Sequence, residues 1–288
     1  MQLGLGTANF AMQYGVTNDS QMSRDETQVI LNEALSSGIR FIDTAQLYGN
    51  AESVLGQYQN LKQFDVISKL GEVIDEAPQQ VITSVQNSLQ NLGIERLYGL
   101  LLHRADSLLK STGEDNFKKL QAAKDLGLVN KIGVSVYQTS ELQHIIKNFK
   151  IDLVQVPINV FDQRFYQSGV LERAKDKNIE IHARSLYLQG TLLTEVEELP
   201  PYFQTYQSTF QQLAQLIDKY QITRLEAALS FVKSLNLVDV AIIGCNNVEQ
   251  LVQTVQMCRQ LPPDIIEDLT QLSCSDEGLI LPTQWRLN

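Results

Sequence analysis

The chain has 288 residues and a net charge of −10, with 43% apolar and 19% charged residues. The acidic balance argues against a nucleic-acid partner, because proteins that bind the phosphate backbone present a basic surface. No apolar run reaches the roughly 18 residues of a membrane-spanning helix. The three cysteines form no CxxC pair, which is typical of a reduced chain. We therefore expect a cytoplasmic globular protein that binds neither nucleic acid nor membrane.

Short apolar runs alternate with amphipathic stretches along nearly the whole chain. Most of these runs are continuously hydrophobic, as expected of parallel strands covered by helices. The expected strands are Leu3–Thr7, Gly38–Asp43, Phe64–Lys69, Leu97–His103, Lys131–Ser135, Leu153–Pro157, Ile179–Ser185 and Val238–Gly244. The expected helices are Asp25–Ser37, Pro78–Leu92, Asn116–Leu126, Thr139–Lys147, Gly169–Lys177, Arg224–Leu235 and Val248–Leu261.

Eight strands that alternate with helices predict a single α/β domain over residues 1–288, folded as a (β/α)8 TIM barrel of parallel strands. A doubly wound open sheet is the alternative. Two segments interrupt the alternation: Tyr187–Tyr220, which carries two adjacent prolines, and a C-terminal tail, Pro262–Asn288. Neither has the composition of a linker between domains.

Four side chains of catalytic type follow consecutive predicted strands. Asp43 and Tyr48 follow the second strand, Lys69 the third and His103 the fourth. Strand ends of this kind form the active-site face of a barrel. Taken singly, each residue has an ordinary structural explanation, such as a helix cap or a solvated lysine, but four at neighbouring strand ends favour a site. The histidines lie outside any HExxH motif, so no metal site is expected.

The chemistry of these four groups suits a carbonyl substrate. A lysine that ends an apolar strand needs a counter-ion, and Asp43 is the obvious one. An ammonium beside Tyr48 stabilises the phenolate and lowers a pKa that is about 10 in isolation. Tyr48 is then a usable general acid, and His103 is placed to orient the carbonyl oxygen while a hydride arrives from a cofactor.

The sequence resembles the aldo-keto reductase family. The resemblance rests on stretches in the family's order: GLGT (4–7), FIDTAQLYGNAESVLG (41–56), ISKL (67–70), LLHR (101–104), KIGVSVYQTSEL (131–142), IDLVQVPINVFDQ (151–163), IHARSLYLQG (181–190) and AIIGCNNVEQL (241–251). It implies a (β/α)8 barrel and a nicotinamide cofactor bound in extended form. By motif match, Asp43, Tyr48, Lys69 and His103 fall on the family's catalytic tetrad.

The resemblance also implies which residues hold the cofactor. Ser135 and Gln155, or Asn159 in place of Gln155, match the positions that hold the nicotinamide carboxamide, while Tyr187 matches the stacking ring less well. The full expected set is Gly6, Thr7, Asp43, Ser135, Gln155, Ser185, Leu186, Gln189, Gly190, Gly244, Asn246, Asn247 and Gln250. NADP is the expected cofactor on family frequency, with NAD as the alternative, because Gly244–Glu249 lacks the basic residue that usually holds the 2′-phosphate.

The expected activity is reversible reduction of an aldehyde or ketone, with a weak hint of a sugar-like substrate. The candidate substrate walls are Tyr14, Leu47, Tyr48, Arg104, Phe161, Arg164, Phe165, Tyr187, Phe203 and Trp285. Arg104 or Arg164 is a candidate contact for an acidic substrate, although an ordinary surface pair is favoured for both. Two alternatives remain: a cofactor-binding regulatory barrel with little turnover, and an isomerase or aldolase that uses Lys69 as a Schiff base. The sequence does not indicate the oligomeric state.

Overall fold

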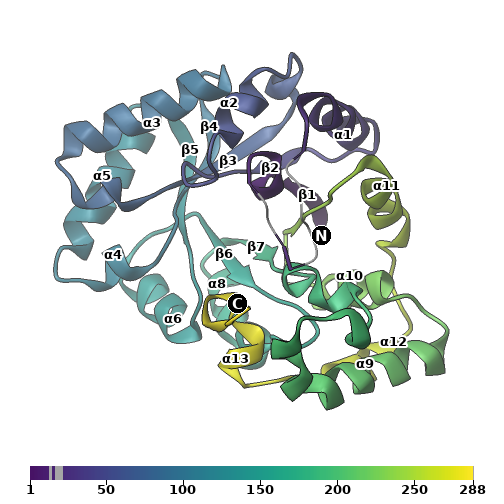
Figure 1. Cartoon of the computed structure of the whole chain (residues 1–288). Helices are drawn as coiled ribbons and strands as arrows, with labels where there is room; N and C mark the ends of the chain where they lie inside the picture. Colours follow the sequence, from purple (N-terminus) through teal and green to yellow (C-terminus); the bar gives the residue numbers. More distant parts are fainter. Residues whose placement is uncertain (13–14, 17–21, 288) are drawn as a thin grey trace.

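The centre of the computed structural model, which describes residues 1–12, 15–16 and 22–287, is a closed barrel of eight parallel strands (Figure 1). The strands are β1 (Gln2–Gly6), β2 (Phe41–Asp43), β3 (Asp65–Leu70), β4 (Leu97–Leu102), β5 (Val129–Ser135), β6 (Leu153–Pro157), β7 (Glu180–Arg184) and β8 (Val240–Ile243). Each pairs with the next in the chain, and β8 pairs with β1 to close the barrel. The predicted (β/α)8 barrel is confirmed, and the open sheet is wrong.

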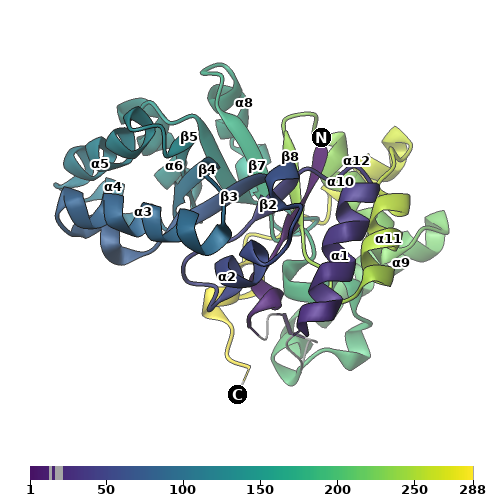
Figure 2. The same ribbon diagram turned by 90° about the horizontal axis from the view of Figure 1, so that it is seen from above.

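Helices surround the barrel (Figures 1 and 2). The longer ones are α1 (Arg24–Ser36), α3 (Pro78–Leu92), α5 (Gly113–Asp125), α6 (Thr139–Asn148), α9 (Gln207–Tyr220), α10 (Arg224–Ser234), α11 (Val248–Met257) and α12 (Pro263–Thr270). Short helices are α2 (Ala51–Gly56), α4 (Asp106–Leu109), α7 (Arg164–Gln167), α8 (Val170–Lys175) and α13 (Glu277–Ile280). Local signals set several ends. Ser23 and Glu26 form a capping box at the start of α1, and α3 has proline in its first turn and ends at Gly93 in the left-handed conformation.

The two segments that interrupt the predicted alternation contain helices. The segment after β7 holds α9, whose buried Phe210 contacts Phe161 edge-on with ring centroids 5.3 Å apart. The helix predicted to reach Leu261 ends at Met257, and α12 and α13 lie in the C-terminal tail. The adjacent prolines at 200 and 201 lie before α9, which begins at Gln207 and contains no proline.

Inward-facing side chains form two layers inside the barrel. The lower layer is an apolar cluster separate from the main core, made of Phe41, Ile67, Leu101, Leu153, Val240 and Ile242. Successive side chains of a strand point to opposite faces, so a residue two positions further along shares the face of the first. Phe41 and Ile67 are therefore followed, one layer up, by Asp43 and Lys69. Gly4 makes room for the apolar layer, because a Cβ there would lie 2.8 Å from the side chain of Ile242.

The chain begins and ends on opposite sides of the molecule (Figure 2). Because β1 starts at the amino-terminal rim of the barrel, the last residues lie on the side where the strands end. Within the described residues, no helix combines the length and the apolar character needed to span a membrane.

Candidate active site

Asp43 and Lys69 form a buried ion pair at the ends of β2 and β3. Lys69 Nζ lies 2.6 Å from Asp43 Oδ2, and the side chains are 1% and 6% exposed for lysine and aspartate. Lys69 Nζ also donates to the carbonyl oxygen of Thr44 at 3.1 Å, and Gln155 Nε2 donates to Asp43 Oδ1 at 2.7 Å. Burial opposes the charged ammonium, but Asp43 and Tyr48 more than offset it, so the pKa of Lys69 is raised. The lysine therefore stays protonated around neutral pH.

Tyr48 is the third partner of this ammonium. Its hydroxyl oxygen lies 3.3 Å from Lys69 Nζ, and Nζ is 4.9 Å from the centroid of the ring. Lysine has three N–H groups and no acceptor, so the three bonds to Asp43, Thr44 and Tyr48 occupy all of its donors. Because the tyrosine oxygen accepts here, its own O–H proton is available to a further acceptor in the cavity that Tyr48 lines.

The His103 ring lies beside Tyr48. The two ring centroids are 5.7 Å apart and nearly perpendicular, at 87°. Burial, with a smaller contribution from Lys69, lowers the pKa of His103 to about 4. The imidazole is therefore neutral at physiological pH and carries one N–H donor. Its Nδ1 is buried and has no hydrogen-bond partner among the described residues.

Hydrogen bonds to the neighbouring strand hold the loop that carries Tyr48 in place. Glu52, in the first turn of α2, is 6% exposed and accepts a hydrogen bond from Ser68 Oγ of β3 at 2.6 Å. Ser68 directly precedes Lys69, so this bond ties the tyrosine loop to the strand that holds the ammonium. Thr7 adds a second anchor, because its backbone N–H and its hydroxyl both donate to the carbonyl oxygen of Asp43.

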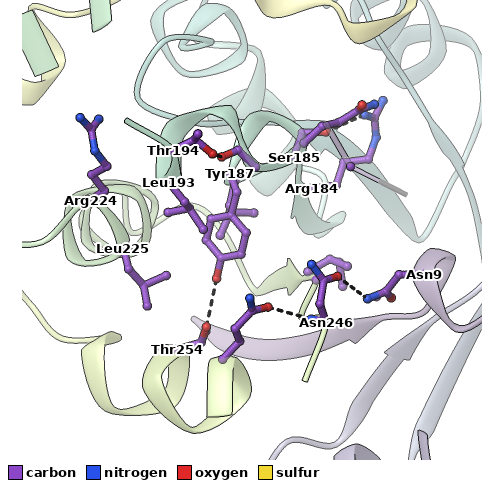
Figure 3. Close-up of a pocket in the computed structure, with 18 of the residues that line it drawn as sticks. Asn9, Arg184, Ser185, Tyr187, Leu193, Thr194, Arg224, Leu225, Asn246 and Thr254 are labelled. Carbon is purple, nitrogen blue, oxygen red and sulfur yellow. Dashed lines mark hydrogen bonds between the residues drawn. The ribbon is translucent and has the colours of Figure 1, made fainter. Parts of the chain in front are cut away.

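A cavity of about 810 Å³ is lined in part by Asp43 and Tyr48, and Figure 3 shows other residues that line it. Lys69 and His103 lie beside Tyr48 but are not among the described residues that line the cavity. The cavity extends from Tyr48 and Gln155 to Arg224 at the start of α10. Most of the residues predicted to bind a cofactor line it: Gly6, Thr7, Asp43, Gln155, Ser185, Leu186, Gln189, Gly190, Gly244, Asn246 and Gln250.

Two predicted cofactor residues are not among those that line this cavity in the described part of the chain. Ser135 Oγ accepts a hydrogen bond from Arg184 Nε at 3.3 Å. Asn247 caps α11 by accepting from the backbone N–H of Gln250 at 2.8 Å. Asn159, the alternative to Gln155, is fully buried, and its Oδ1 accepts from two backbone N–H groups of its own loop. A contact between these side chains and a cofactor stays a prediction.

The structure adds two arginines that the sequence analysis did not place in the site. Arg184 and Arg224 lie at opposite ends of the cavity (Figure 3). Arg224 Nη2 lies 2.6 Å from Glu195 Oε2, while its Nη1 is buried without a partner among the described residues. Arg184 directly precedes Ser185, and Arg224 is the first residue of its helix. In the sequence, only their positions at the end of a strand and at the start of a helix could have indicated that these arginines belong to the site.

Most of the expected substrate walls lie elsewhere. Phe161, Phe165 and Phe203 are fully buried in the core, and Phe161 and Phe203 contact other aromatic rings there. The expectation that these three residues line the substrate site is wrong. The sequence alone does not distinguish an aromatic residue that lines a site from one that packs in the core. Arg164 forms an ion pair with Asp162 at 2.8 Å, as expected, but the aspartate is fully buried, so the pair is not the surface pair that the sequence favoured. Of the other candidates, Tyr48 and Tyr187 line the cavity, and Tyr14 lies outside the described residues.

A model of the aldo/keto reductase family matches residues 2–273. The chain belongs to this family. Oxidoreductase YdhF of Escherichia coli is 25% identical over 279 residues, which are 88% of this chain and 90% of that protein. The holo form of an aldo-keto reductase from Bacillus halodurans has a TM-score of 0.78 at 16% identity, covering 99% of this chain and 95% of that one. An aldo-keto reductase of Bombyx mori in complex with NADP has a TM-score of 0.69 at 22% identity, covering 94% and 88%.

Membership confirms the resemblance that the sequence motifs predict. Aldo-keto reductases are oxidoreductases that use NAD(P)H and act on small carbonyl substrates.

Proposed function

We propose that the chain reduces an aldehyde or ketone to an alcohol with NAD(P)H. The observation that carries this proposal is the buried relay from carboxylate to phenol. Asp43 Oδ2 lies 2.6 Å from Lys69 Nζ, which lies 3.3 Å from the Tyr48 hydroxyl at the cavity wall. Such a relay suits a reaction in which a carbonyl oxygen gains negative charge and then a proton.

Each side chain has one task in this proposal. When bound, the nicotinamide supplies the hydride. Tyr48 gives its proton to the carbonyl oxygen, and the Lys69 ammonium stabilises the phenolate that remains. Asp43 holds the ammonium in place and keeps it charged. His103, neutral at physiological pH, directs its N–H at the carbonyl oxygen and so fixes the orientation of the substrate.

The cavity walls fit a dinucleotide. A side chain at Gly244 would meet no protein atom within 4 Å, so this glycine leaves the wall open where a ligand can approach the backbone. The N-terminus of α11 lies beside it and favours negative charge, as helix N-termini do for phosphates. We propose that the cofactor binds along Gly6, Thr7, Asp43, Ser135, Gln155, Ser185, Leu186, Gln189, Gly190, Gly244, Asn246, Asn247 and Gln250.

NADP is the proposed cofactor, with NAD as the alternative. The Bombyx mori relative in complex with NADP supports this choice. The loop from Gly244 to Gln250 offers no cation to a 2′-phosphate, and Arg224, which also lines the cavity, is already paired with Glu195. Fluorescence titrations with NADPH and NADH measure the preference directly: a Kd for NADH equal to or below that for NADPH would replace NADP by NAD in the proposal.

The Tyr48→Phe variant tests the proposed activity. Loss of the phenolic proton donor is expected to lower kcat by about 100-fold or more, while NADPH binding stays unchanged. Retained turnover would show that Tyr48 is not the acid. Tight NADPH binding by the wild type without turnover of any aldehyde or ketone would instead favour the regulatory barrel.

We also propose that residues 1–288 form one domain that works in the cytoplasm. The closed barrel and a hydrophobic core drawn from all parts of the described chain support a single domain. Three cysteines without a disulfide are consistent with a reducing compartment.

A further inference from the structure

The charges that act on His103 are mainly positive, although the whole chain has a net charge of −10. Lys69, Arg184 and Arg104 all act on the titration of His103 in the direction of a positive field, and Asp43 alone among the main contributors opposes them. The Asp43 carboxylate is already paired with Lys69 at 2.6 Å. Because this pair is internally neutralised, Arg184 and Arg104 are the remaining cations among the main contributors at His103.

Among these three cations, Arg184 is the one that lines the cavity in the described part of the chain. It follows His182 by two residues on β7, so it shares the inward face of that strand one step nearer the mouth. Its side chain crosses the end of β6 to reach β5: Nε donates to Ser135 Oγ at 3.3 Å, and Nη2 donates to the carbonyl oxygen of Val136 at 3.1 Å. The guanidinium carbon lies 4.2 Å from the centroid of the Tyr137 ring, which supports one face of the group. The side chain is therefore held in place before any ligand arrives.

The contacts of Arg184 leave both charge and donors unsatisfied. The third hydrogen bond joins Nη1 to Ser185 Oγ at 3.2 Å. All three acceptors are neutral oxygens, and three of the five N–H groups of arginine are used. No carboxylate lies within ion-pair distance among the residues that the structure describes, whereas Arg164, Arg224 and Arg259 each have one. A half-buried guanidinium without a counter-ion is costly, and this one lines the cavity.

We infer that Arg184 recognises an anionic group, a carboxylate or a phosphate, on the carbonyl substrate. The inference rests on the proposed function, since it names the substrate class of the same site. The position of Arg184 favours the substrate over the cofactor as the source of the anion. Its contacts to Ser135, Val136 and Tyr137 draw it towards β5, and its charge acts on His103. Two of its partners, Ser135 and Ser185, belong to the proposed cofactor site, and Ser135 is proposed to hold the nicotinamide end, beside which the substrate carbonyl must lie.

Matched substrates test the inference on the wild-type protein. 3-Carboxybenzaldehyde and 4-carboxybenzaldehyde are compared with their neutral methyl esters at saturating NADPH. The acids are expected to have a kcat/KM about 10- to 100-fold higher than the esters, the range of a charge-assisted hydrogen bond. In Arg184→Gln this ratio falls towards 1. In Arg96→Gln, a matched loss of charge at an exposed residue just before β4, at the opposite rim of the barrel, the ratio is kept.

A binding experiment separates the inference from the proposed activity. Calorimetric titration with benzoate and with benzamide needs no turnover. Wild type is expected to bind benzoate at least about tenfold more tightly, and Arg184→Gln to lose this difference. Arg184→Lys keeps the positive charge but loses the planar guanidinium, so we expect it to retain part of the preference for benzoate. This variant replaces Arg184→Gln if the glutamine variant does not fold. Benzoate selectivity without turnover of any aldehyde would support the anion site and overturn the proposed function.

Two results would overturn the inference. One is an equal kcat/KM for the carboxylic acids and their methyl esters in the wild type, with both classes of aldehyde converted to alcohols. The other is acid selectivity that survives in Arg184→Gln. If this variant also binds NADPH about tenfold more weakly, Arg184 is assigned to the cofactor phosphates instead.

Discussion

Replacing Lys69 by methionine separates the structural and catalytic work of the buried ion pair. Methionine fills a similar volume but leaves the Asp43 carboxylate, in a residue that is 4% exposed, with only the hydrogen bond from Gln155 at 2.7 Å. Breaking a buried pair by removing one partner costs about 3–5 kcal/mol. The Gln155 bond compensates part of this, so we expect the free energy of unfolding to fall by about 3 kcal/mol.

Urea denaturation at pH 7 measures this loss, and a double variant identifies its cause. Lys69→Met with Asp43→Asn removes both charges at once and keeps an amide that Gln155 can still contact. We expect the double variant to recover most of the lost stability, within about 1 kcal/mol of wild type. Aldehyde turnover is expected to be lost in Lys69→Met and to stay lost in the double variant.

Either of two results would refute this reasoning. A loss below about 1 kcal/mol in Lys69→Met would mean that the pair is not the buried, strongly coupled unit that its geometry indicates. Turnover within threefold of wild type in Lys69→Met would show that the ammonium does not support the phenol.

Two further predictions concern His103 and Gly244. The pKa of His103 in the folded protein is about 4, against about 6.5 in an unfolded chain, so below pH 6.5 the unfolded state binds the proton first. The free energy of unfolding should therefore decrease as the pH falls from about 6.5 to 4, by up to about 3 kcal/mol. Urea denaturation of wild type and His103→Gln at several pH values in this range isolates that slope, and identical slopes would contradict the burial argument. Gly244→Leu adds a side chain that meets no protein atom at its Cβ, so the unfolding midpoint should hardly change while the Kd for NADPH rises at least about tenfold. Unchanged NADPH affinity would place the cofactor away from this wall.

The sequence alone predicted the strands and the residues at their ends, because the apolar pattern that marks a strand also marks where it ends at the site. Continuous apolar runs marked the strands, and the residues that end them, such as Asp43 and Lys69, necessarily meet at one rim of a parallel barrel. The helix α9 was missed in the sequence analysis. Its segment follows two adjacent prolines, and many of its residues are polar, so its apolar positions were not recognised as one helical face. Its buried Phe210 packs against Phe161, which is distant in the sequence, and against Phe203.

Arg184 was missed for a different reason. Its importance comes from reaching over β6 to partners on β5, and from the absence of a carboxylate beside it among the described residues. Neither property is visible in the order of residues. A similar limit applied to Phe203, whose contact with Trp285 at 4.9 Å between ring centroids places it in the core rather than at a substrate wall.

The two layers inside the barrel explain why the charged groups can act together. The apolar cluster that contains Phe41 and Ile67 lies below the Asp43–Lys69 pair, and little water reaches the pair from that side. Charge interactions are stronger where water is excluded, so the ammonium is held firmly by its carboxylate and still stabilises a phenolate. Asp43 neutralises Lys69, whereas Arg184 keeps its positive charge uncompensated among the described residues. The acid-forming step and the recognition of an anion thus depend on different cations, and for this reason Lys69→Met and Arg184→Gln should impair different measurements.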